Sequence, residues 1–160
     1  MTIAAGALLT GTWTSAQLAA GGTPAVGDLF TASGGKIYKF VQYDTGAGGV
    51  AAVAGQVAYY YAPGGTSAGA TTVVTSDLSD SAGVGAGVLQ AAPGDGEYGW
   101  IQIKGAATLS IALTAGGDGA QLTPTGATDG TLDVSTASTD HICAAAIDAS
   151  AKIVMCDFPF

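Results

Sequence analysis

A strand–turn–strand pattern that occurs twice in the second half of the chain constrains the fold most strongly. Residues 84–90 (VGAGVLQ) lead into the turn 91–97 (AAPGDGE) and then into the alternating run 98–104 (YGWIQIK). Residues 141–147, the turn 148–151 and residues 152–158 repeat this arrangement. Gly, Pro, Asp and Ser favour turns because they tolerate turn dihedrals or bond their own backbone. The pattern predicts two β-hairpins and a strand-rich fold.

The rest of the chain also favours short strands separated by glycine-marked turns. Glycine accounts for 26 of 160 residues, while the hydrophobic fraction of 48% and the charged fraction of 10% argue against disorder. We interpret the glycines as turn and bulge positions, including a corner at 105–106, where one strand bends into the next. The sequence therefore predicts an all-β single domain over 23–160, a β-barrel or β-sandwich of roughly ten short, mainly antiparallel strands. Residues 1–22 are expected to form an N-terminal arm or edge segment, with one helical turn at 15–20.

The charge balance excludes several classes of partner. Twelve acidic residues face four lysines and no arginine, for a net charge of −8. Phosphate backbones and anionic membrane surfaces attract clusters of Lys and Arg, so neither nucleic acid nor a membrane is an expected partner. No apolar run approaches the ~20 residues of a membrane span.

The residues that could carry catalysis are few and scattered. His141 is the only histidine and begins an apolar run, and no Gly-x-Ser-x-Gly elbow is present. Asp95 and Glu97 share one hairpin turn, where solvation is the simpler interpretation. Cys143 and Cys156 are either two small buried thiols or a disulfide across the last hairpin, and their spacing does not suggest zinc. The sequence thus predicts no enzyme activity, no cofactor and no metal site.

Aromatic residues are the better candidates for a functional surface. The run 59–61 (YYY) places rings on both faces of one strand, either for core or subunit packing or for an exposed row that binds a sugar or partner. The apolar N-terminal segment and the closing Phe-Pro-Phe are poorly explained by a self-contained barrel. We therefore predict intermolecular contacts anchored by aromatic side chains, the candidate interface residues being Trp13, Tyr59, Tyr61, Phe158 and Phe160.

Several segments taken together resemble small virion structural proteins of tailed bacteriophages that decorate or cement the capsid. The resemblance rests on the run 96–109, on 117–118 with 122–124, on 129–132, on 141–149 and on the closing 153–158. Residues 36–42 (KIYKFVQ) look like the aromatic strand in the first half of such proteins. The resemblance covers residues 27–160, and the N-terminal segment and the Phe-Pro-Phe end depart from it.

The resemblance implies a β-barrel or β-sandwich, often trimeric, on the outer surface of the capsid. The implied partners are the major capsid protein and further copies of the chain, and the protein would be made in the host cytoplasm before it joins the virion. An alternative is a phage tail or fibre component that binds a host receptor or glycan. An enzyme such as a glycan hydrolase is the least favoured class.

Overall fold

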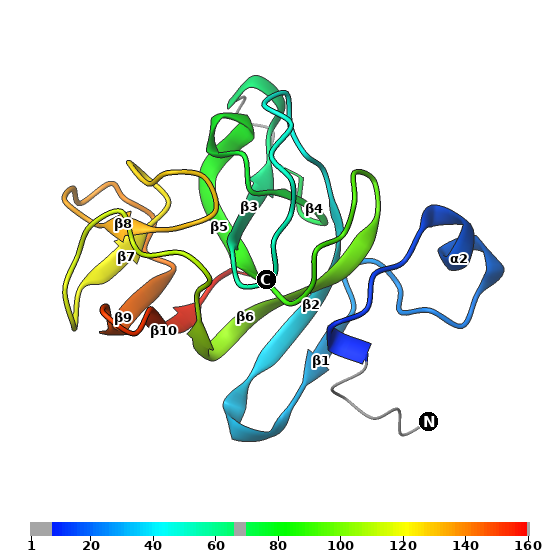
Figure 1. Cartoon of the computed structure of the whole chain (residues 1–160), viewed down its shortest axis with the longest axis horizontal. Coiled ribbons are helices and arrows are strands. Elements are labelled where there is room, and N and C mark those ends of the chain that lie inside the picture. Colours follow the sequence, from blue (N-terminus) through cyan, green and yellow to red (C-terminus); the bar gives the residue numbers. More distant parts are fainter. Residues whose placement is uncertain (1–7, 66–69, 160) are drawn as a thin grey trace.

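Ten strands form one continuous sheet in the computed structural model, which describes residues 8–65 and 70–159 (Figure 1). In spatial order the strands run β1-β2-β4-β3-β5-β6-β10-β9-β7-β8. Their bounds are β1 (Leu29–Thr31), β2 (Ile37–Tyr43), β3 (Val57–Tyr61), β4 (Val73–Thr75), β5 (Ser81–Leu89), β6 (Tyr98–Thr108), β7 (Gln121–Thr123), β8 (Asp133–Val134), β9 (Ala144–Asp148) and β10 (Ile153–Asp157). The helix α2 (Ser15–Ala20) precedes β1, and the 3-10 turns η1 (Ser33–Gly35), η2 (Pro63–Gly65) and η3 (Leu78–Asp80) lie between strands.

Five of these strands close into a barrel. β2, β4, β3, β5 and β6 are neighbours in the sheet, and β6 pairs back onto β2 to complete the ring. The pairing is antiparallel except between β2 and β4. Side chains that alternate inward, among them Val41, Tyr43 and Ile101, are fully or almost fully buried in its interior. The predicted all-β single domain is confirmed, with a closed barrel as its core.

A bend at Gly105 allows β6 to take part both in the barrel and in the part of the sheet beyond it. Before the bend β6 pairs with β2, and from Lys104 to Thr108 it pairs with β10. Gly105 has φ +88°, and a Cβ atom there would lie 3.0 Å from Cγ of Lys36, so glycine is required for conformation and for space. The predicted corner at 105–106 is confirmed. Beyond it, the second half of β6 with β10, β9, β7 and β8 forms what we call the side sheet.

Both predicted hairpins are present. β5 and β6 pair Val88 with Gln102 and Leu89 with Ile101, and β9 pairs with β10 around the turn at 149–152. Past the bend, β6 continues only to Thr108. The backbone N–H of Leu109 donates to the Lys152 carbonyl, and that of Ser110 donates to the Gly55 carbonyl. Because successive residues bond to different segments, the strand ladder cannot continue.

The N-terminal segment covers the outer face of the barrel at β2 and β6. The side chain of Thr14 caps α2 in a capping box with Gln17, which confirms the helical turn expected at 15–20. Trp13 and Tyr98 exchange two backbone hydrogen bonds of 2.9 and 2.8 Å. The Trp13 ring meets Phe40 edge-on with centroids 5.2 Å apart, and Phe40 lies 5.2 Å from Trp100. Aromatic packing therefore attaches the edge segment to the sheet.

The segment after β10 returns into the core. Phe158 is 1% exposed, and its backbone N–H donates to the Ile103 carbonyl at 3.0 Å. Its ring lies against β5 at Gly85, where an added Cβ would stand 2.8 Å from Cε1 of Phe158 and 2.9 Å from Sγ of Cys143. Gly85 is therefore needed because it leaves room for the Phe158 ring, whereas the glycines at turns are needed for their backbone conformation.

We predict that Phe158 and Gly85 contribute to stability as a pair. Phe158→Ala should lower the free energy of unfolding by about 3–5 kcal/mol because it empties a fully buried site. Gly85→Ala should cost about 1–3 kcal/mol by overpacking, and the double variant should lose less than the sum. Urea denaturation of the four proteins measures the coupling. Gly117→Ala is the control, since nothing lies within 4 Å of its Cβ position. A Phe158→Ala protein as stable as the parent would contradict the assignment.

Candidate functional site

The structure corrects the prediction that Tyr59 and Phe158 anchor an intermolecular contact. Both side chains lie in the core of their own chain, at 0% and 1% exposure. The Tyr59 hydroxyl donates to the Thr131 carbonyl at 2.5 Å and accepts from the Thr131 N–H at 3.0 Å, and burial raises the pKa of Tyr59. Of the two interpretations of 59–61, core packing holds for Tyr59 and for Tyr60, which is 7% exposed.

The remaining predicted anchors have different environments. Trp13 is half-buried against Phe40, and Phe160 lies outside the described residues. Tyr61 is half-buried at an acidic end of the molecule. Desolvation and then the nearby carboxylates of Asp44, Asp80, Asp95 and Asp77 raise the pKa of Tyr61. Trp13 and Tyr61 therefore remain candidate contact residues, each partly covered by its own chain.

Buried carboxylates organise the loops at this acidic end. Asp80 accepts hydrogen bonds from the N–H of Ala47 and, at 2.8 Å, from that of Gly64, so it joins the loop after β2 to η2. Asp77 accepts from the N–H of Gly48 at 2.8 Å and from Ser79. Both carboxylates are almost fully buried. Their hydrogen bonds assign them a structural role in holding the loops, as expected of turn aspartates.

The ionisation of Asp77 should make stability depend on pH. Burial on its own would raise the pKa of Asp77, but hydrogen bonds from Ser79 and from the N–H groups of Gly48, Ser79 and Asp80 outweigh it, so the pKa lies below its ordinary value. A carboxyl group with a lowered folded-state pKa stabilises the fold above its unfolded pKa of about 3.9, and the contribution is lost as pH falls through the folded pKa.

We predict that Asp77→Asn lowers the free energy of unfolding by about 2 kcal/mol at pH 7, since an amide cannot replace all of these charged hydrogen bonds. The deficit should shrink as pH falls below 4, where the parent carboxylate protonates. Urea denaturation between pH 7 and pH 2.5 measures both effects. Asp133→Asn, on the short edge strand β8, is the control. An equal deficit at every pH would show that the charge of Asp77 is not the cause.

Lys39 is a buried lysine of β2 whose hydrogen-bond network reaches the C-terminal segment. Its Nζ donates to the Tyr60 hydroxyl at 3.0 Å and to the Thr71 carbonyl at 2.8 Å, and it lies 5.0 Å from the Tyr60 ring centroid. The Tyr60 hydroxyl in turn donates to the Pro159 carbonyl at 3.1 Å. Burial lowers the pKa of Lys39. The group links β2, β3 and the residue that follows Phe158 into one hydrogen-bonded network.

The two cysteines are free and buried, which resolves the alternatives left open by the sequence. Burial raises the pKa of Cys156 to about 12, although Lys36 opposes the shift, and burial also raises the pKa of Cys143. Protonated, inaccessible thiols are poor nucleophiles.

We predict that neither thiol reacts with N-ethylmaleimide at pH 7.5 within an hour in the folded protein, and that both react within minutes in 8 M urea. Mass spectrometry counts the adducts. Ser150→Cys, at the exposed turn between β9 and β10, supplies a control thiol that should label in the folded protein. Rapid labelling of Cys143 or Cys156 in the parent would contradict the packing described for them.

A pocket of about 380 Å³ lies where the barrel meets the side sheet. It opens between the loop at Ala54 and Gly55, the ends of β5 and β2, and the bend of β6. Its polar side chains include Lys36, Gln90 and Gln102. We call it the junction pocket. It combines these polar side chains with the apolar residues Val88, Leu89 and Ala107.

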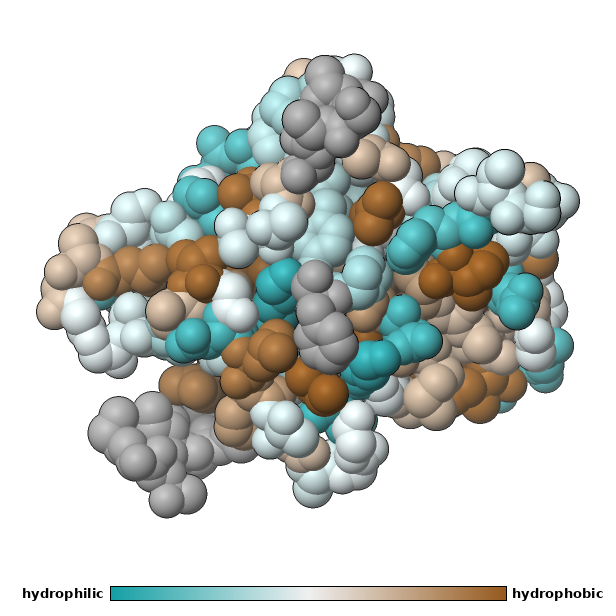
Figure 2. Space-filling model, turned by 180° about the vertical axis from the view of Figure 1, so that it is seen from behind, coloured by the Kyte–Doolittle hydropathy of each residue, from teal (hydrophilic) through white to brown (hydrophobic). Residues whose placement is uncertain are grey.

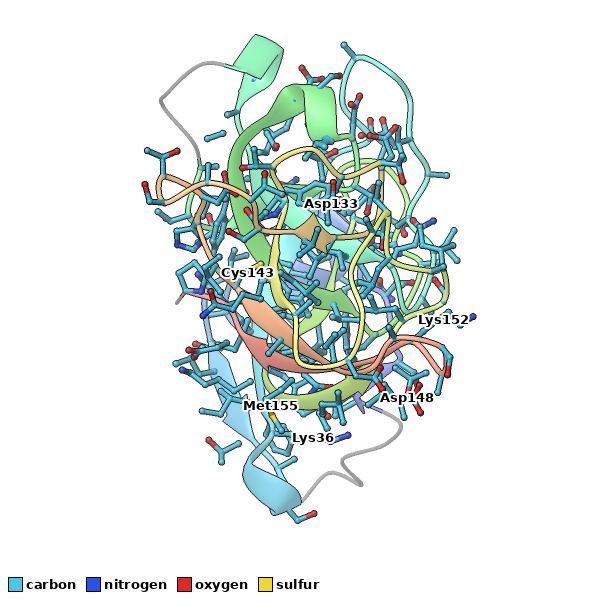
Figure 3. The ribbon with its side chains drawn as sticks, turned by 90° about the vertical axis from the view of Figure 1, so that its left-hand side faces the viewer. Lys36, Asp133, Cys143, Asp148, Lys152 and Met155 are labelled. Atoms are coloured by element: carbon cyan, nitrogen blue, oxygen red, sulfur yellow. The ribbon has the colours of Figure 1, made fainter. Side chains whose placement is uncertain are left out.

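The outward face of the side sheet carries exposed apolar side chains. Ile147 on β9 and Met155 on β10 are each 45% exposed, and Met155 lies opposite Ala106 and Ala145 in the pairing register. Two lysines lie beside these residues: Lys104 on β6 forms an ion pair with Asp157 of β10, and Lys152, in the turn between β9 and β10, donates to the Ser110 carbonyl at 3.0 Å. Figure 3 labels Met155 and Lys152 in a view of this side of the molecule. We call this surface the lysine-bordered face. Seen from behind the view of Figure 1, the surface shows separate hydrophobic patches with polar residues between them (Figure 2).

The candidate catalytic residues do not come together. The carboxylate of Glu97 accepts from the N–H of Gly94 at 2.8 Å, and that of Asp95 accepts from the N–H of Thr45 at 3.1 Å, so both stabilise loops. His141 is exposed ahead of β9. Within residues 8–65 and 70–159, no three His, Cys, Asp or Glu side chains are grouped as metal ligands. No helix within the described ranges is long and apolar enough to cross a membrane.

No protein-family model, curated protein or solved structure matches this chain. The resemblance to tailed-phage virion proteins therefore rests on the segments quoted from the sequence.

Proposed function

We propose that this protein is a non-enzymatic structural protein of a tailed-phage virion that decorates or cements the outer surface of the capsid. It binds the major capsid protein and other copies of itself, and it acts as a homotrimer. It is made in the host cytoplasm and is carried on the capsid surface. The resemblance of residues 27–160 to such proteins supports the class, and the lysine-bordered face supports a binding role.

The lysine-bordered face is the observation that carries the proposal. It presents Met155 and Ile147 from paired strands, so the two side chains are held by backbone hydrogen bonds rather than by a mobile loop. Methionine is enriched in protein interfaces, and a preorganised surface loses little conformational entropy on binding. These properties suit a contact that must be repeated in the same geometry at many lattice positions.

The distribution of charge supports self-association. Two of the four lysines, Lys104 and Lys152, border this face, although the net charge of the chain is −8. The loops held by Asp77 and Asp80 lie at the opposite end of the barrel from η1 and Lys36 (Figures 1 and 3). A positive surface on one copy can pair with a negative surface on the next copy, which gives a head-to-tail contact. Such contacts close into a ring when the rotation between neighbouring copies permits it. A trimeric ring satisfies this requirement.

The mechanism is mass action on the capsid lattice. Each copy that bridges neighbouring capsid subunits adds contacts that must break before the shell expands or opens. Once one contact of a trimer has formed, the further contacts of the same trimer form intramolecularly. Contacts that are weak one by one therefore give high occupancy of the capsid sites. The protein needs a stable fold and two binding surfaces for this role, and no reacting group.

The alternative is a tail or fibre component that binds a host receptor or glycan, and the junction pocket is the feature that favours it. Gold-labelled antibody against this protein on purified particles separates the two functions. Label spread over the heads at a fixed copy number supports the decoration role. Label confined to tail tips supports the alternative, and absence of the protein from purified virions excludes both.

We predict that a charge introduced at the lysine-bordered face weakens assembly. Met155→Asp and Ile147→Asp should each raise the dissociation constant of the trimer at least about tenfold, since each places a carboxylate in an apolar contact. Sedimentation equilibrium measures the mass as a function of concentration, and circular dichroism checks the fold. Leu29→Asp on β1 is the matched control, because Leu29 is 52% exposed on a different edge of the sheet. A parent protein that stays monomeric at high concentration would contradict the trimer.

A further inference from the structure

The aromatic side chains on the outer face of β2 and β6 form a cluster that is separate from the barrel core. Tyr38, Phe40 and Trp100 are its buried members, and we call them the aromatic cluster. Residues 8–20, which we call the docking segment, cover it with Leu8, Leu9, Trp13 and Leu18. The buried side chains that make up the barrel core include none from the docking segment. The segment can therefore leave the aromatic cluster without opening the barrel.

Trp13 anchors the docking segment. Its backbone exchanges two hydrogen bonds with Tyr98, and its ring meets Phe40 edge-on with 5.2 Å between the ring centroids. None of the residues of α2 is buried, and in Figure 1 this helix stands out to one side of the barrel. Because a large aromatic side chain in a fitted site dominates a contact of this kind, loss of the Trp13 ring should release the segment.

One polar atom of the aromatic cluster is left unsatisfied while the cluster is covered. Trp100 is 3% exposed, and its Nε1 is buried without a hydrogen-bond partner among residues 8–65 and 70–159. An indole N–H that is cut off from water and has no acceptor costs free energy. Water can reach this N–H when the cluster opens, which offsets part of the cost of exposing the aromatic rings. The covered cluster is therefore easier to open than a contact in which every polar group is satisfied.

The connection between the docking segment and the barrel has the properties of a hinge. Gly21 and Gly22 are exposed and have φ of +82° and +79°, and no described residue beyond their chain neighbours lies within 4 Å of their Cβ positions. Glycine adopts backbone dihedrals that other residues avoid, so the chain can change direction here without a clash. The barrel resumes at Gly27, whose N–H donates to the Phe40 carbonyl at 2.8 Å.

The charge distribution along the chain favours contact of this segment with another copy. Residues 1–27 contain no charged side chain, whereas the whole chain has a net charge of −8. Two copies therefore repel each other through the charges of residues 28–160, while the docking segment adds no side-chain charge to that repulsion. An uncharged segment on a hinge is suited to reach a second copy.

We propose that the docking segment is exchanged between copies, so that residues 8–20 of one copy cover the aromatic cluster of the next. The second copy fits because the exchanged contact repeats the one made within a single chain. Around a trimer, each copy gives one docking segment and receives one. This inference rests on the proposed function only in requiring that copies of the chain associate, and it names the segment and the surface that link them.

Cross-linking between isotopically distinct copies tests the exchange. The photoreactive residue p-benzoylphenylalanine replaces Trp13 in the full-length protein, and isotope-labelled and unlabelled protein are unfolded in urea, refolded together and irradiated. Trypsin cleaves after lysine, so it separates residues 1–36, which contain the cross-linker, from residues 40–104, which contain Phe40 and Tyr98. Exchange predicts mixed-isotope pairs of these two peptides as often as single-isotope pairs. Labelled and unlabelled proteins combined only after irradiation are the control and should give no mixed pairs.

A variant without the anchor measures how much the exchange adds to association. Trp13→Ala should raise the dissociation constant of the trimer at least about tenfold while the circular dichroism stays like that of the parent. Thr12→Ala, at an exposed position of the same segment, is the matched control and should associate like the parent. Cross-links confined to single-isotope pairs overturn the exchange, and so does a Trp13→Ala protein that associates like the parent. If sedimentation shows a trimer while every cross-link is single-isotope, the exchange fails and the proposed trimer stands.

Discussion

The bend of β6 at Gly105 is the constraint on which the rest of the architecture depends. Its first part completes the barrel by pairing with β2, and its second part starts the side sheet by pairing with β10. Only a residue without Cβ fits there, because φ is +88° and the Lys36 side chain lies directly against it. The junction pocket and the lysine-bordered face both lie beside this bend. A single glycine thus sets the relative placement of the two surfaces on which function is proposed.

Features governed by neighbouring residues could be predicted from the sequence. The hairpins, the corner at 105–106 and the helical turn at 15–20 follow from turn chemistry, alternation and capping, which act over a few residues. The structural role of aspartates in turns could be predicted for the same reason, because it also depends on neighbouring residues. Asp77 bonds to Ser79 two residues away, although its bond to Gly48 could not be foreseen.

Features that depend on distant pairing could not be predicted. The sequence shows that Tyr59 and Phe158 are large aromatic residues. Because both interfaces and cores are built from such residues, the sequence does not indicate which of the two they occupy. Only the closure of β6 on β2, and the return of the chain past β5, put these side chains inside. The orientation of the Gln102 amide likewise depends on the bend, because the carbonyls of Lys104 and Ala106 both accept from its Nε2.

The contact between Phe158 and Gly85 has a consequence for the order in which the molecule folds. The two residues are far apart in the chain, so the slot beside β5 stays empty during synthesis until the segment after β10 has left the ribosome. Long-range closure of this kind slows folding, and the open sheet is exposed to association meanwhile. The last step in folding should be docking of this segment. Phe158→Ala should therefore accelerate unfolding far more than it slows refolding.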